Sequence, residues 1–113
     1  MKGETNMASH PDFVIYVTEQ LREAGVIRSR KMFGEYGLYC DDIFFGVICD
    51  DQFFVKVTPQ GEAAFPHLPK TPPYEGAKDS FLVEDVDNRE QMTELVSLTC
   101  EILKSTPSKK GRK

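Results

Sequence analysis

The sequence predicts an α+β domain of two layers, in which a mostly antiparallel sheet of about five strands carries helices on one face. Two observations lead to this prediction. Apolar side chains recur at helical spacing in residues 13–24 and again in residues 92–103. Residues 27–57 are rich in β-branched and aromatic side chains, and short turn signals interrupt them. The predicted order of elements is therefore α-β-β-β-β-α-β-α.

A first helix is expected after residue 9. Ser9 or Asp12 is suited to cap it, Pro11 fits its first turn, and Gly25 is placed to end it. Its apolar stripe is expected to be formed by Phe13, Val14, Val17, Leu21 and Ala24.

Four consecutive strands are expected after this helix, joined by hairpins. They are predicted near residues 27–32, 36–40, 43–49 and 52–57. Asp41-Asp42 and Asp50-Asp51 are expected to form two of the turns, because a short acidic side chain tolerates turn geometry and bonds nearby amides.

A short helix is expected to follow the strands. Thr58 is suited to its N-cap and Pro59 to its first position. Residues 66–78 contain four prolines and a glycine, which predicts a loop with a restricted backbone.

The chain is expected to finish with a strand and a helix. Residues 80–83 have strand character, and Asp87 with Glu90 three positions later predicts a capping-box start for the last helix. Its buried stripe is expected to hold Met92, Leu95, Val96, Thr99, Ile102 and Leu103.

Composition indicates one soluble domain. The chain has 113 residues, of which 40% are hydrophobic, and a formal net charge of −4. No apolar run reaches the roughly 18 residues of a spanning helix, so we expect no membrane contact and a cytoplasmic location. Its three cysteines are widely spaced and odd in number, which argues against a disulfide framework.

Charge is concentrated at the C-terminal end. Five of the 14 basic residues lie in the last ten positions, so residues 1–103 carry nine bases against 18 acids. We expect a domain over residues 9–104 between a disordered segment 1–8 and a disordered basic tail 105–113. An acidic body argues against a broad nucleic-acid face, which leaves nucleic acid to the tail, assisted by Arg28, Arg30 and Lys31.

Apolar side chains occupy both faces of two predicted strands. Phe44 and Phe45 are consecutive, and Phe54 points away from the face that carries Phe53 and Val55. A strand that is apolar on both sides requires cover on both sides. Either a partner, a second copy or a ligand supplies that cover, or the proline-rich loop and the twist of the sheet do.

The sequence contains no recognisable constellation for catalysis. The three cysteines and two histidines lack the close paired spacings of zinc sites, and the aspartate pairs are too far apart to share a cation. We therefore expect no catalytic residue, no metal and no cofactor, and we do not expect an enzyme.

Residues 30–57 resemble the signature of the TfoX (Sxy) N-terminal domain family. The matching motifs are Arg30-Lys31, Met32-Phe33-Gly34, Tyr36-Gly37-Leu38-Tyr39 and Phe54-Val55-Lys56, followed by Pro72-Pro73-Tyr74-Glu75-Gly76 and Phe81-Leu82-Val83. The resemblance extends over about residues 10–104. Glu35 stands where many members have a second glycine. This variant resembles one branch of short single-domain relatives.

This resemblance implies an α+β domain similar to secretion chaperones, and a role in regulating competence genes. The full-length regulators also have a C-terminal domain, which we do not expect in this chain. A separate polypeptide completing the function is an open alternative.

We therefore expect a non-enzymatic regulatory module that acts through a protein partner or as a homodimer in transcriptional regulation. The expected binding residues are Arg30, Lys31, Glu35, Tyr36, Phe44, Phe45, Phe54, Lys56 and Tyr74. A small anionic ligand is the alternative, because Arg30, Lys31 and Lys56 are cationic and Tyr36 and Tyr74 supply aromatic lining.

Overall fold

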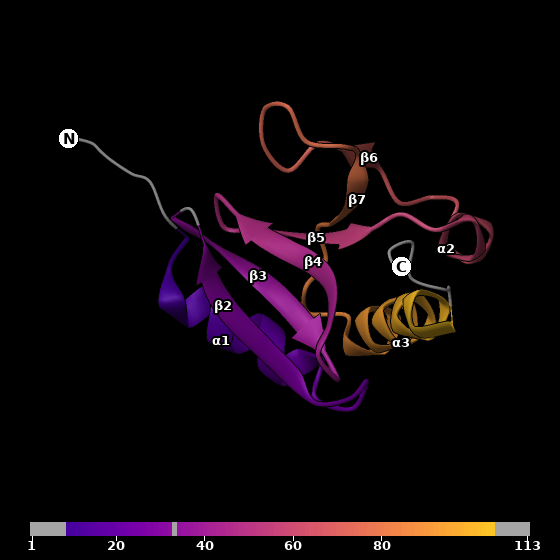
Figure 1. Ribbon diagram of the computed structural model, residues 1–113, viewed down its shortest axis with the longest axis horizontal. Coiled ribbons are helices and arrows are strands. Elements are labelled where there is room, and N and C mark those ends of the chain that lie inside the picture. The colour runs from indigo at the N-terminus through magenta and orange to yellow at the C-terminus, as the bar shows by residue number, and fades with distance from the viewer. Residues whose placement is uncertain (1–8, 33, 106–113) are drawn as a thin grey trace, which may run out of the picture.

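The computed structural model describes residues 9–32 and 34–105, which form one sheet and three helices (Figure 1). The elements in chain order are α1 (Pro11–Gln20), β2 (Ile27–Met32), β3 (Glu35–Cys40), β4 (Ile43–Cys49), β5 (Gln52–Lys56), α2 (Pro59–Ala64), β6 (Lys70–Thr71), β7 (Ser80–Val83) and α3 (Arg89–Ser105). The predicted α+β class is confirmed. Of the predicted terminal segments 1–8 and 105–113, only Ser105, the last residue of α3, lies within the described residues.

The sheet has six strands in the order β2-β3-β4-β5-β7-β6. All neighbouring strands are antiparallel. The sixth strand corrects the prediction of an uninterrupted loop over residues 66–78: Lys70 and Thr71 pair with Phe81 and Ser80 of β7. A two-residue strand is too short to show a sequence period of its own.

The two aspartate pairs form the hairpin turns that were predicted. Asp41 and Asp42 have φ values of 50° and 69°, and Asp50 and Asp51 have 55° and 56°. Two central residues in the left-handed region match the right-handed twist of the strands that they join. Aspartate tolerates this region better than most residues, which explains its presence in both turns.

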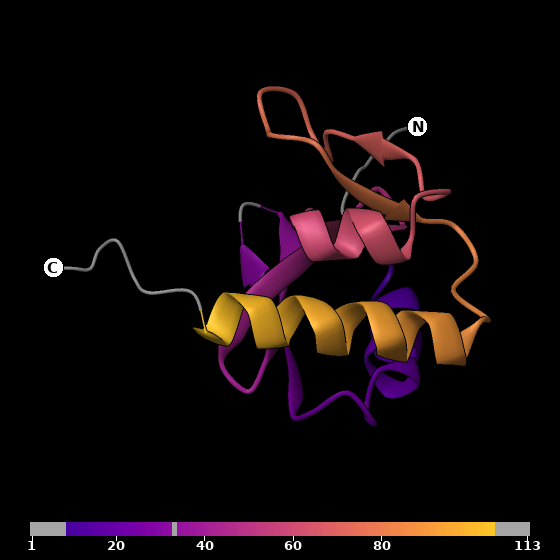
Figure 2. The same ribbon diagram turned by 90° about the vertical axis from the view of Figure 1, so that its right-hand side faces the viewer.

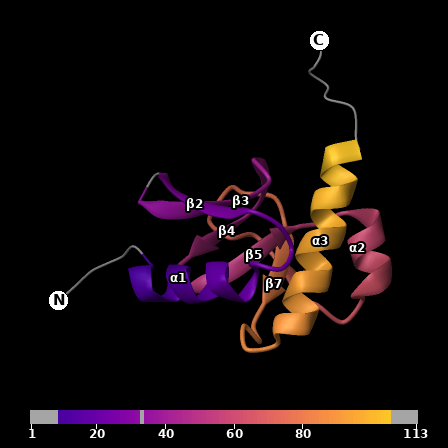
Figure 3. The same cartoon turned by 90° about the horizontal axis from the view of Figure 1, so that it is seen from below.

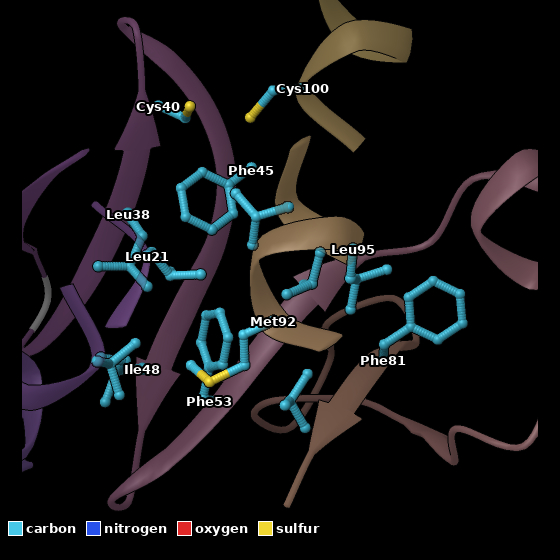
Figure 4. Packing of buried hydrophobic residues seen from close by; sticks show 14 of the residues in the cluster. Leu21, Leu38, Cys40, Phe45, Ile48, Phe53, Phe81, Met92, Leu95 and Cys100 are labelled. Carbon is cyan, nitrogen blue, oxygen red and sulfur yellow. The ribbon is translucent and has the colours of Figure 1, made fainter. Parts of the chain in front are cut away.

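The core lies on one face of the sheet, where α1 and α3 contribute buried residues and Phe65 at the end of α2 joins them. Val14, Val17 and Leu21 of the first helical segment and Met92 and Leu95 of α3 are buried. They pack with the sheet residues Leu38, Phe45, Ile48, Phe53 and Phe81 (Figure 4). Seen from below, α1 lies under the strands, and α3 crosses them with α2 beside it (Figure 3). No helix of residues 9–32 or 34–105 covers the opposite face of the sheet (Figure 3).

A β-bulge in β4 decides which side chains reach each face. Leu38 pairs with Gly46, but the next residue, Tyr39, pairs with Phe44, so Phe45 is the extra residue. Phe45 points into the core and is fully buried. The bulge shifts the alternation along β4, which is why apolar residues occupy both sequence parities there.

The helix starts agree only partly with the predictions. Thr58 caps α2 as predicted, because its Oγ1 accepts a hydrogen bond of 2.9 Å from the N–H of Gly61. The N-cap of α1 is His10, with no side-chain cap bond. Asn88 rather than Asp87 caps α3, since its Oδ1 accepts from the N–H of Gln91. The predicted caps Ser9, Asp12 and Asp87 are therefore wrong.

Within residues 9–32 and 34–105, no helix has both the length and the apolar composition that crossing a membrane requires.

Candidate functional site

The sheet face opposite the helices, which we call the open face, carries an aromatic and cationic surface. Paired residues of an antiparallel ladder point to the same face. Arg28 pairs with Tyr39, and Arg30 pairs with Gly37, so the two arginines of β2 lie on the same face as Tyr39. The strand residues of the open face include Arg28, Arg30, Tyr39, Phe44, Val47, Phe54 and Lys56, and the same register places Glu35, Ser80 and Leu82 there.

Phe44 lies at the centre of the open face. Its ring centroid is 5.3 Å from that of Tyr39, and the ammonium nitrogen of Lys56 lies 4.7 Å above its ring. A cation over an aromatic face at this distance contributes about 0.5–1 kcal/mol at an exposed site. Gly37 makes room for this arrangement, because a Cβ there would lie 3.1 Å from the Phe44 ring.

A groove with a volume of about 330 Å³ opens beside Phe44. β4 and β5 form one side of it, and the loop between β6 and β7 forms the other. Figure 2 shows this loop projecting away from α3. The groove is lined by Phe44, Gly46, Val47, Lys56, Val57, Pro73, Tyr74, Ala77, Lys78, Asp79 and Ser80.

The groove combines apolar walls with two lysines. Partial burial lowers the pKa of Lys56, although its residue still reaches solvent. Lys78 approaches from the loop, where Asp79 is the acidic residue in the lining. The charged form of Lys56 is thus poorly solvated where it lies, and an incoming anion would favour that form.

Three of the nine predicted binding residues meet in this groove: Phe44, Lys56 and Tyr74. Arg30 lies on the same face of the sheet, on its edge strand β2. Phe54 also belongs to the open face, but it lies between its paired residues Val47 and Leu82 and is only 2% exposed. The chain itself therefore covers Phe54. Of the two explanations for the extra aromatic residues, cover by the chain rather than by a partner applies to Phe54.

The remaining four predicted residues lie outside the groove. Phe45 is in the core. Tyr36 packs against the same core, and Lys31 pairs with it, so both belong to the helix-covered face. None of these side chains lines the groove.

Glu35 has a structural role that the sequence analysis did not predict. Its Oε1 accepts hydrogen bonds from the N–H and the hydroxyl of Ser9, at 3.0 and 2.7 Å. Its Oε2 accepts from the N–H of Asp50 at 2.9 Å. These bonds explain why Ser9 does not cap α1. They also connect the start of the described chain to the turn between β4 and β5.

Val47, Pro73 and Lys78 line the groove but were not predicted from the sequence. Val47 reaches the open face only because of the bulge, and the loop residues require knowledge of how residues 72–79 fold back. Gly46 was the available signal, since a glycine inside a strand often marks a bulge or a close approach.

The described residues contain no group of three or more His, Cys, Asp or Glu side chains that is arranged to hold a metal ion. Cys40, Cys49 and Cys100 are all buried. Burial raises the pKa of Cys49 to about 11 and that of Cys100 to about 12, so both thiols are poor nucleophiles near neutral pH.

Two comparisons place the chain among known proteins. The profile of the TfoX N-terminal domain family matches residues 19–102. The chain is also similar to an uncharacterized 12.7 kDa protein in the trpE 5′ region of Spirochaeta aurantia. Identity is 32% over 108 residues, which are 95% of this chain and 91% of that protein. Because the family profile matches most of the chain, the chain belongs to the TfoX N-terminal domain family.

Proposed function

We propose that this protein is a non-enzymatic regulatory module that acts by binding another protein through the groove on its open face. Membership in the TfoX N-terminal domain family supports a regulatory role linked to competence. The single observation that carries the proposal is the groove itself, in which Phe44, Lys56 and Tyr74 come together from two strands and a loop.

The composition of the groove favours a protein partner. Aromatic residues are enriched in the buried centres of protein interfaces. Tyr74 lines the groove and is 61% exposed, so its ring is accessible to a partner. Phe44 and Val47 are half-buried beside it and extend the apolar surface into the groove.

Site-specific photo-crosslinking in the native host tests this proposal. Benzoylphenylalanine replaces Tyr74 in one variant and Ile15 in a matched control. Ile15 is 54% exposed on α1, a helix that packs on the other face of the sheet. We expect a discrete protein adduct at position 74 and none at position 15, identified by mass spectrometry.

Two results would contradict the proposal. Adducts of equal yield at both positions would indicate random collision rather than a specific partner. A complete lack of adducts at position 74 would remove the groove as a protein-binding surface.

The groove volume supports a second candidate, a small anionic ligand. At about 330 Å³, the groove lies at the lower end of the range for ligand pockets, roughly 300–1,000 Å³. A thermal-shift screen of nucleotides and acidic metabolites tests this candidate. Stabilisation that the Lys56→Gln variant loses would favour it over a protein partner, and no stabilisation by any compound would reject it.

A further inference from the structure

The open face carries positive charge on both sides of Phe44. Arg28 and Arg30 lie on β2, two strands away from Phe44, and Lys56 lies on the neighbouring strand β5. Lys78 adds a fourth cation from the loop. Neighbouring strands are about 4.8 Å apart, so β2 and β5 are separated by about 14 Å, which an extended segment of about five residues spans.

These four cations have no carboxylate partner within the described part of the chain. The ion pairs found there join His10 to Asp51, Lys70 to Glu62 and Lys104 to Asp41. The positive charge of the open face is therefore not neutralised by salt bridges inside the molecule. An anionic partner would meet cations that have no competing ion pair to break.

The other side of the molecule carries an excess of negative charge. The helices α1 and α3 and the turn after α1 expose three basic side chains against six acidic ones: Asp12, Glu19, Glu23, Glu90, Glu94 and Glu101. Such a separation of charge attracts an acidic partner to the open face and repels it from the helical side. It therefore orients the partner before contact.

The apolar part of the groove lies between the cations. Phe44, Val47 and Pro73 line the groove, whose volume of about 330 Å³ accommodates one or two apolar side chains. Apolar burial supplies affinity here, while the cations on either side supply register and specificity.

The same features argue against a second copy as the occupant. A second copy bound symmetrically would bring like charges together.

From this arrangement we propose that the open face recognises an extended protein segment in which acidic residues flank an apolar centre. Its carboxylates bind Arg28 and Arg30 on one side and Lys56 and Lys78 on the other, and its apolar side chain fills the groove beside Phe44. This proposal rests on the proposed function and specifies the chemistry of the partner.

A titration followed by amide chemical shifts tests the proposal. The probe is a blocked hexapeptide with two glutamates on each side of a leucine-phenylalanine pair, and a peptide with glutamines in place of the glutamates is the control. We expect shifts at Phe44, Val47, Lys56 and Lys78. The double variant Lys56→Gln/Lys78→Gln should weaken binding about tenfold, as the loss of two exposed ion pairs predicts.

The matched control variant is Arg22→Gln/Lys31→Gln, which removes two exposed cations that do not belong to the open face. It should leave the affinity for the probe unchanged. Equal binding of the glutamine peptide, or no shifts at the open face, would overturn the proposal. So would stronger binding of a thymidine oligonucleotide at the same amides, since it would identify nucleic acid as the occupant.

The crosslinking experiment separates this inference from the proposed function. If the adduct at position 74 forms with the same yield in the Lys56→Gln/Lys78→Gln variant, the groove binds a protein without the aid of these charges. The proposed function would then stand, and the acidic segment would be rejected. Loss of both the adduct and the peptide shifts in this variant would support both.

Discussion

Single carboxylates hold residues 9 and 10 against the sheet. Glu35 binds Ser9 and the N–H of Asp50, while Ser9 in turn accepts a hydrogen bond of 2.9 Å from the N–H of Asp51. Asp51 then binds the N–H of His10 at 2.8 Å and its ring at 2.6 Å. The carboxyl group of Glu35, which stands where many family members have glycine, thus stabilises local structure. A comparison of sequences alone does not indicate this role.

Asp51 should make this contact dependent on pH. Burial acts to raise its pKa, but the hydrogen bonds and charge of His10 prevail and lower the pKa from the ordinary value of 3.8. A carboxyl group with a lower pKa in the folded state stabilises that state above the unfolded pKa. This stabilisation is lost as the pH falls through the folded pKa.

We therefore predict that Asp51→Asn lowers the free energy of unfolding at neutral pH by less than about 1 kcal/mol, because the site is exposed. Asparagine also tolerates the φ of 56° at this position and keeps an acceptor for the His10 N–H, so the change removes the charge and the acceptor for the His10 ring. Urea unfolding of both proteins across a pH series measures the effect. A difference that persists unchanged in acid would contradict the prediction.

The buried thiols provide a second prediction for single residues. Burial raises the pKa of all three cysteines, and it raises that of Cys100 to about 12. Since the thiolate is the reactive form, we expect Ellman's reagent at pH 8 to label the native protein far more slowly than free cysteine. In urea all three thiols should react at once. Rapid labelling of even one thiol in native buffer would contradict their burial.

At the scale of elements, the bulge in β4 connects the core to the binding surface. It directs Phe45 into the core and leaves Phe44 and Val47 on the open face. Gly46 makes the bulge compatible with the neighbouring strand, because a Cβ at this position would lie 2.2 Å from the carbonyl oxygen of Phe54. The groove therefore depends on a residue without a side chain.

We predict that Gly46→Ala destabilises the fold by about 3 kcal/mol, the upper part of the usual range for overpacking, because backbone atoms must move. The control is Gly76→Ala in the loop, where no atom lies within 4 Å and only the φ of 89° opposes a side chain. It should cost about 1 kcal/mol. Denaturant unfolding compares the two variants, and equal losses would contradict the close approach at Gly46.

The strands illustrate what the sequence predicts and what it does not. Five of them, and the turns at Asp41-Asp42 and Asp50-Asp51, follow from side-chain type and local turn chemistry. The two-residue strand β6 exists only because it pairs with β7, and the bulge only because two strands must stay in register. Both features depend on tertiary contacts that no local pattern contains.

At the scale of the whole molecule, the candidate site was predictable only in part for the same reason. Residue types indicated Phe44, Lys56 and Tyr74, which the structure brings together in the groove. The same reasoning also selected Phe45 and Tyr36, which face the core, because strict alternation ignores the bulge and the position of the helices. Which side chains are exposed on the open face depends on how the whole sheet and its helices assemble.

The separation of charge also makes a prediction about self-association. A symmetric dimer through the open face would place Arg28, Arg30, Lys56 and Lys78 of one copy against the same residues of the other. Such like charges repel most strongly at low ionic strength. We therefore predict a mass of 12.8 kDa by light scattering across a concentration series, at low and at moderate salt.

A dimer mass would contradict this prediction and support the homodimer expected from the sequence. The dimer could then be built on the open face or on α1. If the mass doubles with concentration, Phe44→Ser should restore the monomer for a dimer built on the open face, whereas Ile15→Ser should do so for one built on α1. Circular dichroism must show both variants folded. Only the first outcome would mean that a second copy competes with an acidic partner for the groove.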